Sequence, residues 1–225
     1  MSLPRLITCA LPLVLMSSQF LPAQEADQPK SVKWESAIQE IESRDAKNPP
    51  KPGGVLFVGS SSIRLWKLQE SFPDLNGINH GFGGSEIIDS VYYFDRLVVP
   101  CQPRMIVFYA GDNDIGNKTP PAQVHANFQK FVALTHEKLP EARIVFIPIK
   151  PSIKRWSLIE LVREANGLIR RTCEQDDKLI YLEIERPMLG EDGKPRPELF
   201  ATDGLHLSPE GYALWSDLLK PHLAP

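Results

Sequence analysis

Four short polar segments of this chain hold side chains that could carry out acyl transfer. They occur at residues 59–62 (GSSS), 81–85 (GFGGS), 111–114 (GDND) and 203–206 (DGLH). Each segment alone is weak evidence, because a serine cluster commonly caps a helix and a glycine pair commonly forms a turn. Together, and in this order, they supply a hydroxyl nucleophile, hydrogen-bond donors and an acid–histidine pair.

Ester hydrolysis gives each of these groups a task. A serine hydroxyl is a weak nucleophile at neutral pH, so an imidazole must accept its proton and a carboxylate must hold that imidazole in the right tautomer. We predict Ser61 as the nucleophile, His206 as the base and Asp203 as its partner. The attacked carbonyl becomes an oxyanion, which donors fixed in advance stabilise. For this oxyanion hole we predict the backbone N–H groups of Ser61 and Gly84 and the side chain of Asn113.

Apolar runs alternate with segments of helical spacing along the chain. The apolar runs begin at residues 55, 78, 105, 143 and 179, and helical spacing occupies 34–41, 85–98, 121–139, a segment from about 156, and 209–221. Strands this uniformly apolar are buried on both faces, which occurs when crossover helices cover a parallel sheet. We therefore predict an α/β fold, a three-layer α/β/α sandwich with about five parallel strands.

This fold would gather the polar segments at one edge of the sheet. Open parallel sheets bind ligands beyond the carboxyl ends of their strands, near the point where the strand order reverses. Three of the polar segments directly follow the first three apolar runs, and the fourth lies in the loop before the last helix. We therefore expect all four segments at that edge.

Several local predictions concern helix ends and the core. Ser208 and Pro209 suit the N-cap and first turn of the last helix, and Ser62 is predicted to cap the helix after the first strand. Cys173 falls on the apolar face of the helix that starts near residue 156, so it should be a buried small apolar residue. Cys101 and Cys173 alone do not make a disulfide framework.

Other polar residues near the predicted edge receive structural interpretations. Asp112 and Asp114 should brace the loop that aims Asn113, and His80 should make a structural hydrogen bond. Segment 149–156 (IKPSIKRW) follows the fourth strand and also faces the edge. We interpret it as a capped connection and leave it out of the predicted site.

At the four polar segments the chain resembles the SGNH hydrolases, also called GDSL-type esterases and lipases, from about residue 55 to 220. Its matching blocks are Gly59-Ser60-Ser61 leading to Trp66, NHGFGGS with Gly84, Gly111 to Asp114, and Asp203 with His206. The family spacing selects Ser61 among the three serines, whereas Ser60 stands where the family usually has Asp. The resemblance implies a flavodoxin-like sheet and ester hydrolysis without a metal or other cofactor.

The resemblance and the short loops favour small acyl groups, such as acetyl esters of carbohydrates. Alternatives are a lipase or lysophospholipase type of acylhydrolase, and a non-catalytic glycan-binding relative. A metal-dependent phosphoesterase is a third alternative, with a cation held by Asp112, Asp114, Asp203, His80 and His206. Against it, these residues lack a tight metal-binding spacing, and Ser61, Gly84 and Asn113 would have no task.

The N-terminal segment predicts export. Residues 1–23 contain Arg5, an apolar stretch from 6 to about 16, and small residues near 23, which is typical of a signal peptide. The stretch is shorter than the roughly 20 residues that span a membrane, so we expect a secreted or periplasmic protein without a permanent membrane anchor. We assign 24–54 to an N-terminal helix and linker and 55–225 to the hydrolase domain.

The charge balance argues against a nucleic-acid partner. The whole chain has a net charge of −3, and removing residues 1–23 takes away Arg5 and no acid, which leaves −4. The sequence has no basic run that would follow a phosphate backbone. We therefore expect a small-molecule or carbohydrate ester as the partner.

Overall fold

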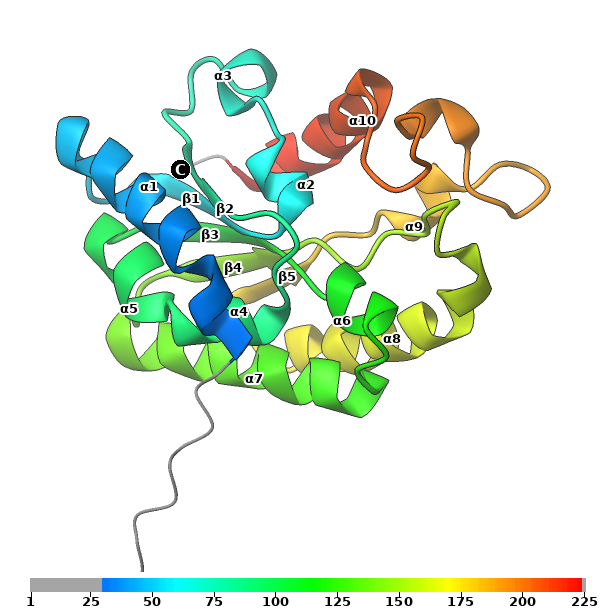
Figure 1. Cartoon of the computed structure of the whole chain (residues 1–225), viewed down its shortest axis with the longest axis horizontal. Coiled ribbons are helices and arrows are strands. Elements are labelled where there is room, and N and C mark those ends of the chain that lie inside the picture. Colours follow the sequence, from blue (N-terminus) through cyan, green and yellow to red (C-terminus); the bar gives the residue numbers. More distant parts are fainter. Residues whose placement is uncertain (1–29, 224–225) are drawn as a thin grey trace, which may run out of the picture.

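A five-stranded parallel sheet forms the centre of the molecule (Figure 1). The computed structural model describes residues 30–223. The strands are β1 (Val55–Gly59), β2 (Ile78–Gly81), β3 (Met105–Tyr109), β4 (Arg143–Phe146) and β5 (Leu179–Tyr181). Their order is β2-β1-β3-β4-β5, the flavodoxin-like order in which the direction of winding reverses between β1 and β3. This confirms the predicted fold.

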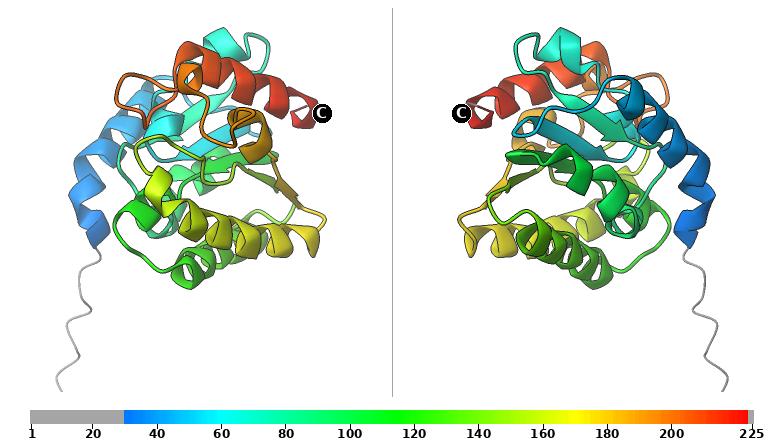
Figure 2. Two further views of the ribbon diagram at one scale, coloured as in Figure 1. Left: turned by 90° about the vertical axis from the view of Figure 1, so that its right-hand side faces the viewer. Right: turned by 90° about the vertical axis from the view of Figure 1, so that its left-hand side faces the viewer.

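Helices cover both faces of the sheet, as the two side views in Figure 2 show. One face carries α1 (Glu35–Lys47), α4 (Ile87–Tyr92), α5 (Phe94–Leu97), α7 (Pro121–Lys138) and α8 (Ile159–Glu174). The other face carries α2 (Ser61–Arg64), α3 (Leu68–Ser71), α9 (Glu185–Met188) and α10 (Pro209–Leu219). A further short helix, α6 (Asp112–Gly116), follows β3.

The two-sided burial explains the uniformly apolar strands. In β1 every residue is buried. Leu56 and Val58 enter the core on one face of the sheet, and Val55 and Phe57 enter the core on the other. Because side chains alternate across a strand, a strand covered on both faces needs apolar residues at successive positions.

The register brings the ends of the first three strands to one level. Gly59 at the end of β1 is paired with Gly81 of β2 and with Tyr109 of β3. The polar segments that follow these strands therefore begin at the same edge of the sheet, as expected.

The predictions for the helix ends are correct in part. Ser208 caps α10, and its hydroxyl accepts the backbone N–H of Gly211 at 3.1 Å. The predicted cap at Ser62 is wrong, because α2 begins at Ser61 with Ser60 at the N-cap position, and Ser62 lies inside the helix and is buried. The helical spacing of 85–98 belongs to two helices, α4 and α5, which are separated by Tyr93 and pack on the same core.

The helix from about 156 starts with a 3-10 turn, Trp156–Leu158, before α8. Cys173 on α8 is buried, as predicted, and both Cys101 and Cys173 are free thiols.

Helix α1 is fixed to the sheet by apolar and charged contacts. Ile38 and Ile41 enter the core beside β2. The guanidinium of Arg96 donates to the carboxylates of Glu35 and Glu42 at 2.7–2.9 Å. The predicted signal peptide lies outside the described residues. Within residues 30–223, no helix has the length and apolar character needed to cross a membrane.

Candidate active site

Ser61 is placed by an unusual backbone at the end of β1. Gly59 has φ 133°, and a Cβ there would lie 1.9 Å from the carbonyl oxygen of Tyr109 on β3. Only glycine allows this close approach of the two strands. The N–H of Ser60 then donates to the same carbonyl at 2.9 Å, and Ser61 starts α2 at the edge of the sheet.

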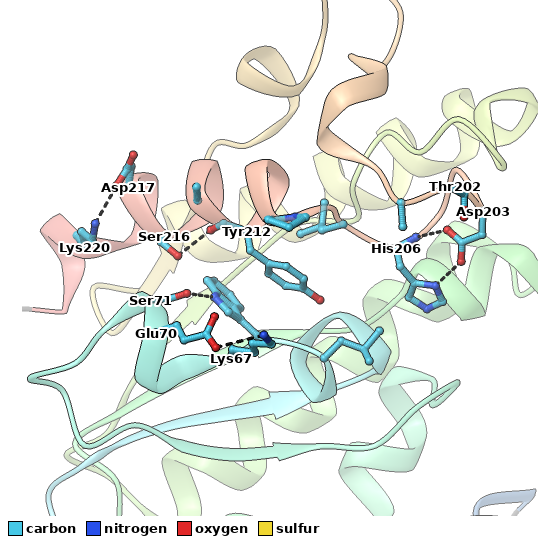
Figure 3. A pocket seen from close by; sticks show the side chains of 16 residues that line it. Lys67, Glu70, Ser71, Thr202, Asp203, His206, Tyr212, Ser216, Asp217 and Lys220 are labelled. Atoms are coloured by element: carbon cyan, nitrogen blue, oxygen red, sulfur yellow. Dashed lines mark hydrogen bonds and ion pairs between the residues drawn. The ribbon is translucent and has the colours of Figure 1, made fainter.

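Ser61, His206 and Asp203 form a hydrogen-bonded chain. The Ser61 Oγ lies 3.0 Å from His206 Nε2, and His206 Nδ1 lies 2.5 Å from Asp203 Oδ2. Because a carboxylate can only accept, Nδ1 carries the proton and Nε2 is free to accept the Ser61 proton. Figure 3 shows Asp203 and His206 together at one end of a cavity.

The Asp203 carboxylate is stabilised by its own loop. The backbone N–H groups of Leu205 and His206 donate to its Oδ1 at 2.9 and 3.0 Å. The hydrogen bond from Leu205, followed by the contacts with His206, holds the pKa of the Asp203 carboxyl well below its usual range. Asp203 is therefore charged at neutral pH, as a partner of an imidazole must be.

Gly84 and Asn113, the predicted oxyanion donors besides Ser61, lie in segments that contact each other. Gly84 follows β2 and has φ 80°, a left-handed conformation that favours glycine. Asn113 is in α6 after β3, and its Nδ2 donates to the carbonyl of Ser85 at 3.0 Å. One hydrogen of the Asn113 amide thus ties the two loops together, which leaves the second for a substrate oxygen.

Trp34 packs against the Gly84 loop, which sequence reasoning did not foresee. A Cβ on Gly84 would lie 3.0 Å from the Trp34 ring. The ring also meets Phe82 edge to face, with centroids 6.1 Å apart. In the sequence, Trp34 is recognisable only as part of the apolar face of the predicted helix 34–41, since nothing in the local sequence shows which surface that face covers.

Two basic side chains, the buried Lys150 and the partly buried Arg155, form ion pairs with Asp112. The Lys150 side chain is 1% exposed, and its Nζ donates to Asp112 Oδ2 at 2.6 Å and to the Tyr109 hydroxyl at 2.8 Å. Arg155 pairs with the other oxygen of Asp112 and donates to Asn113 Oδ1 at 3.1 Å. Burial would raise the pKa of Asp112, but the charges of Lys150 and Arg155 outweigh it and hold that pKa below its usual value.

Asp112 therefore braces the loop that carries Asn113, as predicted. Sequence reasoning missed Lys150 and Arg155, although both lie in segment 149–156. The available signal was the position of this segment after the fourth strand, facing the acidic GDND segment.

Asp114 braces the same loop from the other side. Its carboxyl accepts the N–H of Ile87 at 3.2 Å, which ties α6 to the start of α4. Burial, together with the charge of Glu86, raises the pKa of Asp114 to about 7.

His80 makes the structural hydrogen bond that was predicted. It is fully buried, its Nδ1 lies 2.7 Å from the Leu97 carbonyl, and its Nε2 lies 2.9 Å from Asp45 on α1. Within residues 30–223, Asp45, His80 and Cys101 form the one group of three that could hold a metal ion. Both His80 nitrogens already face protein oxygens, and burial raises the pKa of the Cys101 thiol to about 12, so the group fits a packing contact between α1 and β2.

The residues of the phosphoesterase alternative do not gather in the described part of the chain. His80 faces Asp45 beneath α1, Asp112 is paired with two cations, and Asp203 is paired with His206. The geometry instead joins a hydroxyl, an imidazole and a carboxylate in the order that acyl transfer needs.

The comparison with protein families agrees with this geometry. A match to the GDSL-like Lipase/Acylhydrolase family covers residues 62–214. The chain belongs to this family. The matched residues begin directly after Ser61 and include Gly84, Asn113, Asp203 and His206. Membership makes the protein an ester hydrolase.

This GDSL-like acylhydrolase is similar to a human protein in sequence and to two bacterial proteins in structure. The human platelet-activating factor acetylhydrolase IB subunit alpha1 is 26% identical over 220 residues, which are 91% of this chain and 93% of that protein. A GDSL-like lipase from Bacteroides thetaiotaomicron has a TM-score of 0.71 at 19% identity, covering 83% of this chain and 96% of the other. An acetylxylan esterase from Geobacillus stearothermophilus, solved as a catalytic mutant, has a TM-score of 0.63 at 14% identity, covering 78% and 95%.

A cavity of about 620 Å³ opens beside the triad of this acylhydrolase. It lies between α10 on one side and the end of α2 with α3 on the other, and Asp203 and His206 line one end (Figure 3). Asp203 and His206 are therefore accessible from a space large enough for a small organic ligand, whereas Ser61 does not line it.

Proposed function

We propose that the protein is a serine esterase that cleaves carboxylic esters through an acyl-enzyme on Ser61. The observation that carries this proposal is the distance of 3.0 Å between Ser61 Oγ and His206 Nε2, with Asp203 on the other ring nitrogen. A hydroxyl with this partner is an activated nucleophile.

The reaction has two steps. His206 accepts the Ser61 proton while the oxygen attacks the ester carbonyl, and the N–H groups of Ser61 and Gly84 with the Asn113 amide stabilise the oxyanion. His206 then gives the proton to the leaving alcohol oxygen as the carbon–oxygen bond breaks. Water then attacks the acyl-enzyme while His206 accepts one of its protons, and His206 returns that proton to the Ser61 oxygen as the bond to the acyl carbon breaks and the carboxylic acid leaves.

The proposed substrates are esters of short acyl groups, above all acetyl esters of carbohydrates. Two relatives support an acetyl group by their names, one an acetylhydrolase and one an acetylxylan esterase. We also propose export, because residues 1–23 have the composition of a signal peptide. An exported acetylesterase would meet carbohydrate esters outside the cytoplasm.

Covalent labelling tests the nucleophile. An organophosphonate should modify Ser61, and the Ser61→Ala variant should lose several orders of magnitude in kcat because nucleophile and base act as a unit. Ser60→Ala and Ser62→Ala are matched controls, which should still be labelled at Ser61 when the modified peptide is mapped by mass spectrometry. Near-normal esterase rates in Ser61→Ala would refute the assignment.

Acyl length tests the substrate class separately. We expect kcat/KM to fall in the order acetyl, butyryl, octanoyl for esters of one alcohol. A maximum at octanoyl would overturn the short-chain proposal and favour the lipase type.

A further inference from the structure

The cavity beside the triad continues the face of α2 that carries the nucleophile. Ser61 and Leu65 are four residues apart, so they lie on one side of this turn of chain. Leu65 is 40% exposed and lines the cavity together with His206. Ser61 itself does not line the cavity, which meets the catalytic residues at Asp203 and His206 and runs between Lys67, just before α3, and Ala213 on α10. We call this space the α10 groove.

The position of His206 decides which part of an ester would occupy the α10 groove. His206 must deliver its proton to the leaving oxygen, so the alcohol part of the substrate has to lie beside its ring. His206 lines the groove, whereas Ser61, Gly84 and Asn113, which would contact the ester carbonyl, do not. The alcohol part is therefore the one that extends into the groove.

The charged residues of the α10 groove are all paired. At the far end Lys67 pairs with Glu70 at 3.2 Å and Lys220 pairs with Asp217 at 2.9 Å (Figure 3). At the near end Asp203 pairs with His206. With His206 counted as uncharged, the lining holds the cations Lys67 and Lys220 and one carboxylate more, from Glu70, Asp203 and Asp217. It therefore has no positive excess that would select an anionic head group, but it offers donors and acceptors to hydroxyl groups.

The middle of the α10 groove is apolar and partly aromatic. Leu65, Pro209 and Tyr212 line it, and the Tyr212 ring is fixed because its hydroxyl donates to the Ser62 carbonyl at 2.9 Å. A sugar ring combines an apolar face with hydroxyl groups around its edge, so it matches an apolar middle between polar ends. A long alkyl alcohol would match only the middle.

We propose that the α10 groove is the binding site for the alcohol part of the ester, and that this alcohol is an uncharged sugar. The proposal rests on the proposed esterase function, because it assigns the leaving group of that reaction. It adds Leu65 and Ala213 as residues that determine specificity without taking part in the chemistry.

A binding experiment tests the groove independently of catalysis. Xylobiose, a free sugar product of the expected class, should bind the unaltered protein in a calorimetric titration. Ala213 is exposed on α10 and small, so Ala213→Trp should fill the groove and weaken binding about tenfold or more. Ala133→Trp, at an exposed alanine on α7 across the sheet, is the matched control and should bind xylobiose as the unaltered protein does.

Kinetics then test the role of the bound alcohol. We expect the ratio of kcat/KM for acetylated xylobiose to that for methyl acetate to fall about tenfold in Ala213→Trp and to stay constant in Ala133→Trp. Failure of xylobiose to bind, or equal ratios in the two variants, would overturn the groove proposal even in an active esterase. A preference for octyl acetate over the sugar ester would overturn the sugar class. An unaltered protein that binds xylobiose in the groove but cleaves no ester would instead overturn the proposed function.

Discussion

The direction of the Asn113 amide is set by Arg155. A guanidinium has only donors, so the Asn113 atom that it contacts at 3.1 Å must be the amide oxygen. The amide nitrogen is then directed to the other side, where it already meets the Ser85 carbonyl. Arg155 is itself held by Asp112, so this positioning residue is fixed before any substrate arrives. A preorganised donor of this kind needs no rearrangement when the oxyanion forms.

A double-mutant cycle tests this positioning role. Asn113→Ala should lower kcat about 10²–10³-fold, the cost of one lost oxyanion donor. Arg155→Met should lower kcat in the same direction but less, with a smaller change in KM. Because Arg155 acts through Asn113, the double variant should be no slower than Asn113→Ala alone.

Two further measurements separate positioning from stability. Arg155→Lys retains a donor and should recover part of the kcat that Arg155→Met loses, and urea unfolding should show that each variant is folded under assay conditions. If the losses of Asn113→Ala and Arg155→Met simply add, Arg155 does not work through the amide.

The sequence predicts the reacting residues better than the residues that hold them. Ser61, Asp203 and His206 could be selected by side-chain type and by position after strands, because their chemistry restricts the choice. Lys150 and Arg155 have no such restriction, since a basic residue in a loop usually faces solvent. Their partner Asp112 is 38 and 43 residues away and becomes apparent only when β3 and β4 are paired.

At the level of elements, α1 extends the site beyond the matched family segment. Trp34, the residue directly before α1, packs on the Gly84 loop, and Arg96 fixes the position of α1 through Glu35 and Glu42. The apolar spacing of Trp34, Ile38 and Ile41 predicts a helix with one buried face. It cannot predict that this face covers the Gly84 loop, because that depends on how a helix packs over β2.

Removal of the Trp34 ring should therefore affect catalysis. Trp34→Ala leaves the left-handed Gly84 without its neighbour, so the loop should move more and the oxyanion should be held less well. We expect a lower kcat with little change in KM, measured on a short-chain ester. Val32→Ala is the matched control, because Val32 lies in the same 3-10 helix, Lys30–Trp34, and is 42% exposed. Equal rates for the two variants would argue that α1 contributes only stability.

For the whole molecule, the sheet could be predicted because burial on both faces leaves a simple pattern in the strands. The location of the polar segments follows from the predicted sheet, since the carboxyl ends of parallel strands lie at the same edge. The two-helix structure of 85–98 and the start of α2 could not be predicted in this way. The segment 85–98 makes contacts with distant residues, such as the hydrogen bond at 3.0 Å from the Tyr93 hydroxyl to the Ser31 carbonyl. The start of α2 follows the hydrogen bond at 2.9 Å from the Ser60 N–H to the Tyr109 carbonyl of β3.

The stability of the whole domain should depend on pH through Asp114. Its pKa of about 7 in the folded protein lies above the ordinary value of 3.8, so the folded state binds this proton more tightly than the unfolded state. The resulting stability is present below the ordinary pKa and is lost as the pH rises through about 7. Asp114→Asn keeps an acceptor for the Ile87 N–H and cannot ionise, so the variant should gain stability relative to the parent between about pH 4.5 and about pH 8.

Asp112 supplies a control of opposite sign on the same helix. Lys150 and Arg155 hold its pKa below the usual value, so its contribution to stability is present above the ordinary pKa and is lost as the pH falls. Asp112→Asn should therefore destabilise the protein more at about pH 8 than at low pH, because it also leaves the buried Lys150 without its counter-charge. Urea unfolding over a pH series measures both variants. If the free energy of unfolding of Asp114→Asn differs from that of the parent by the same amount at every pH, the Asp114 carboxyl does not hold its proton in the folded protein.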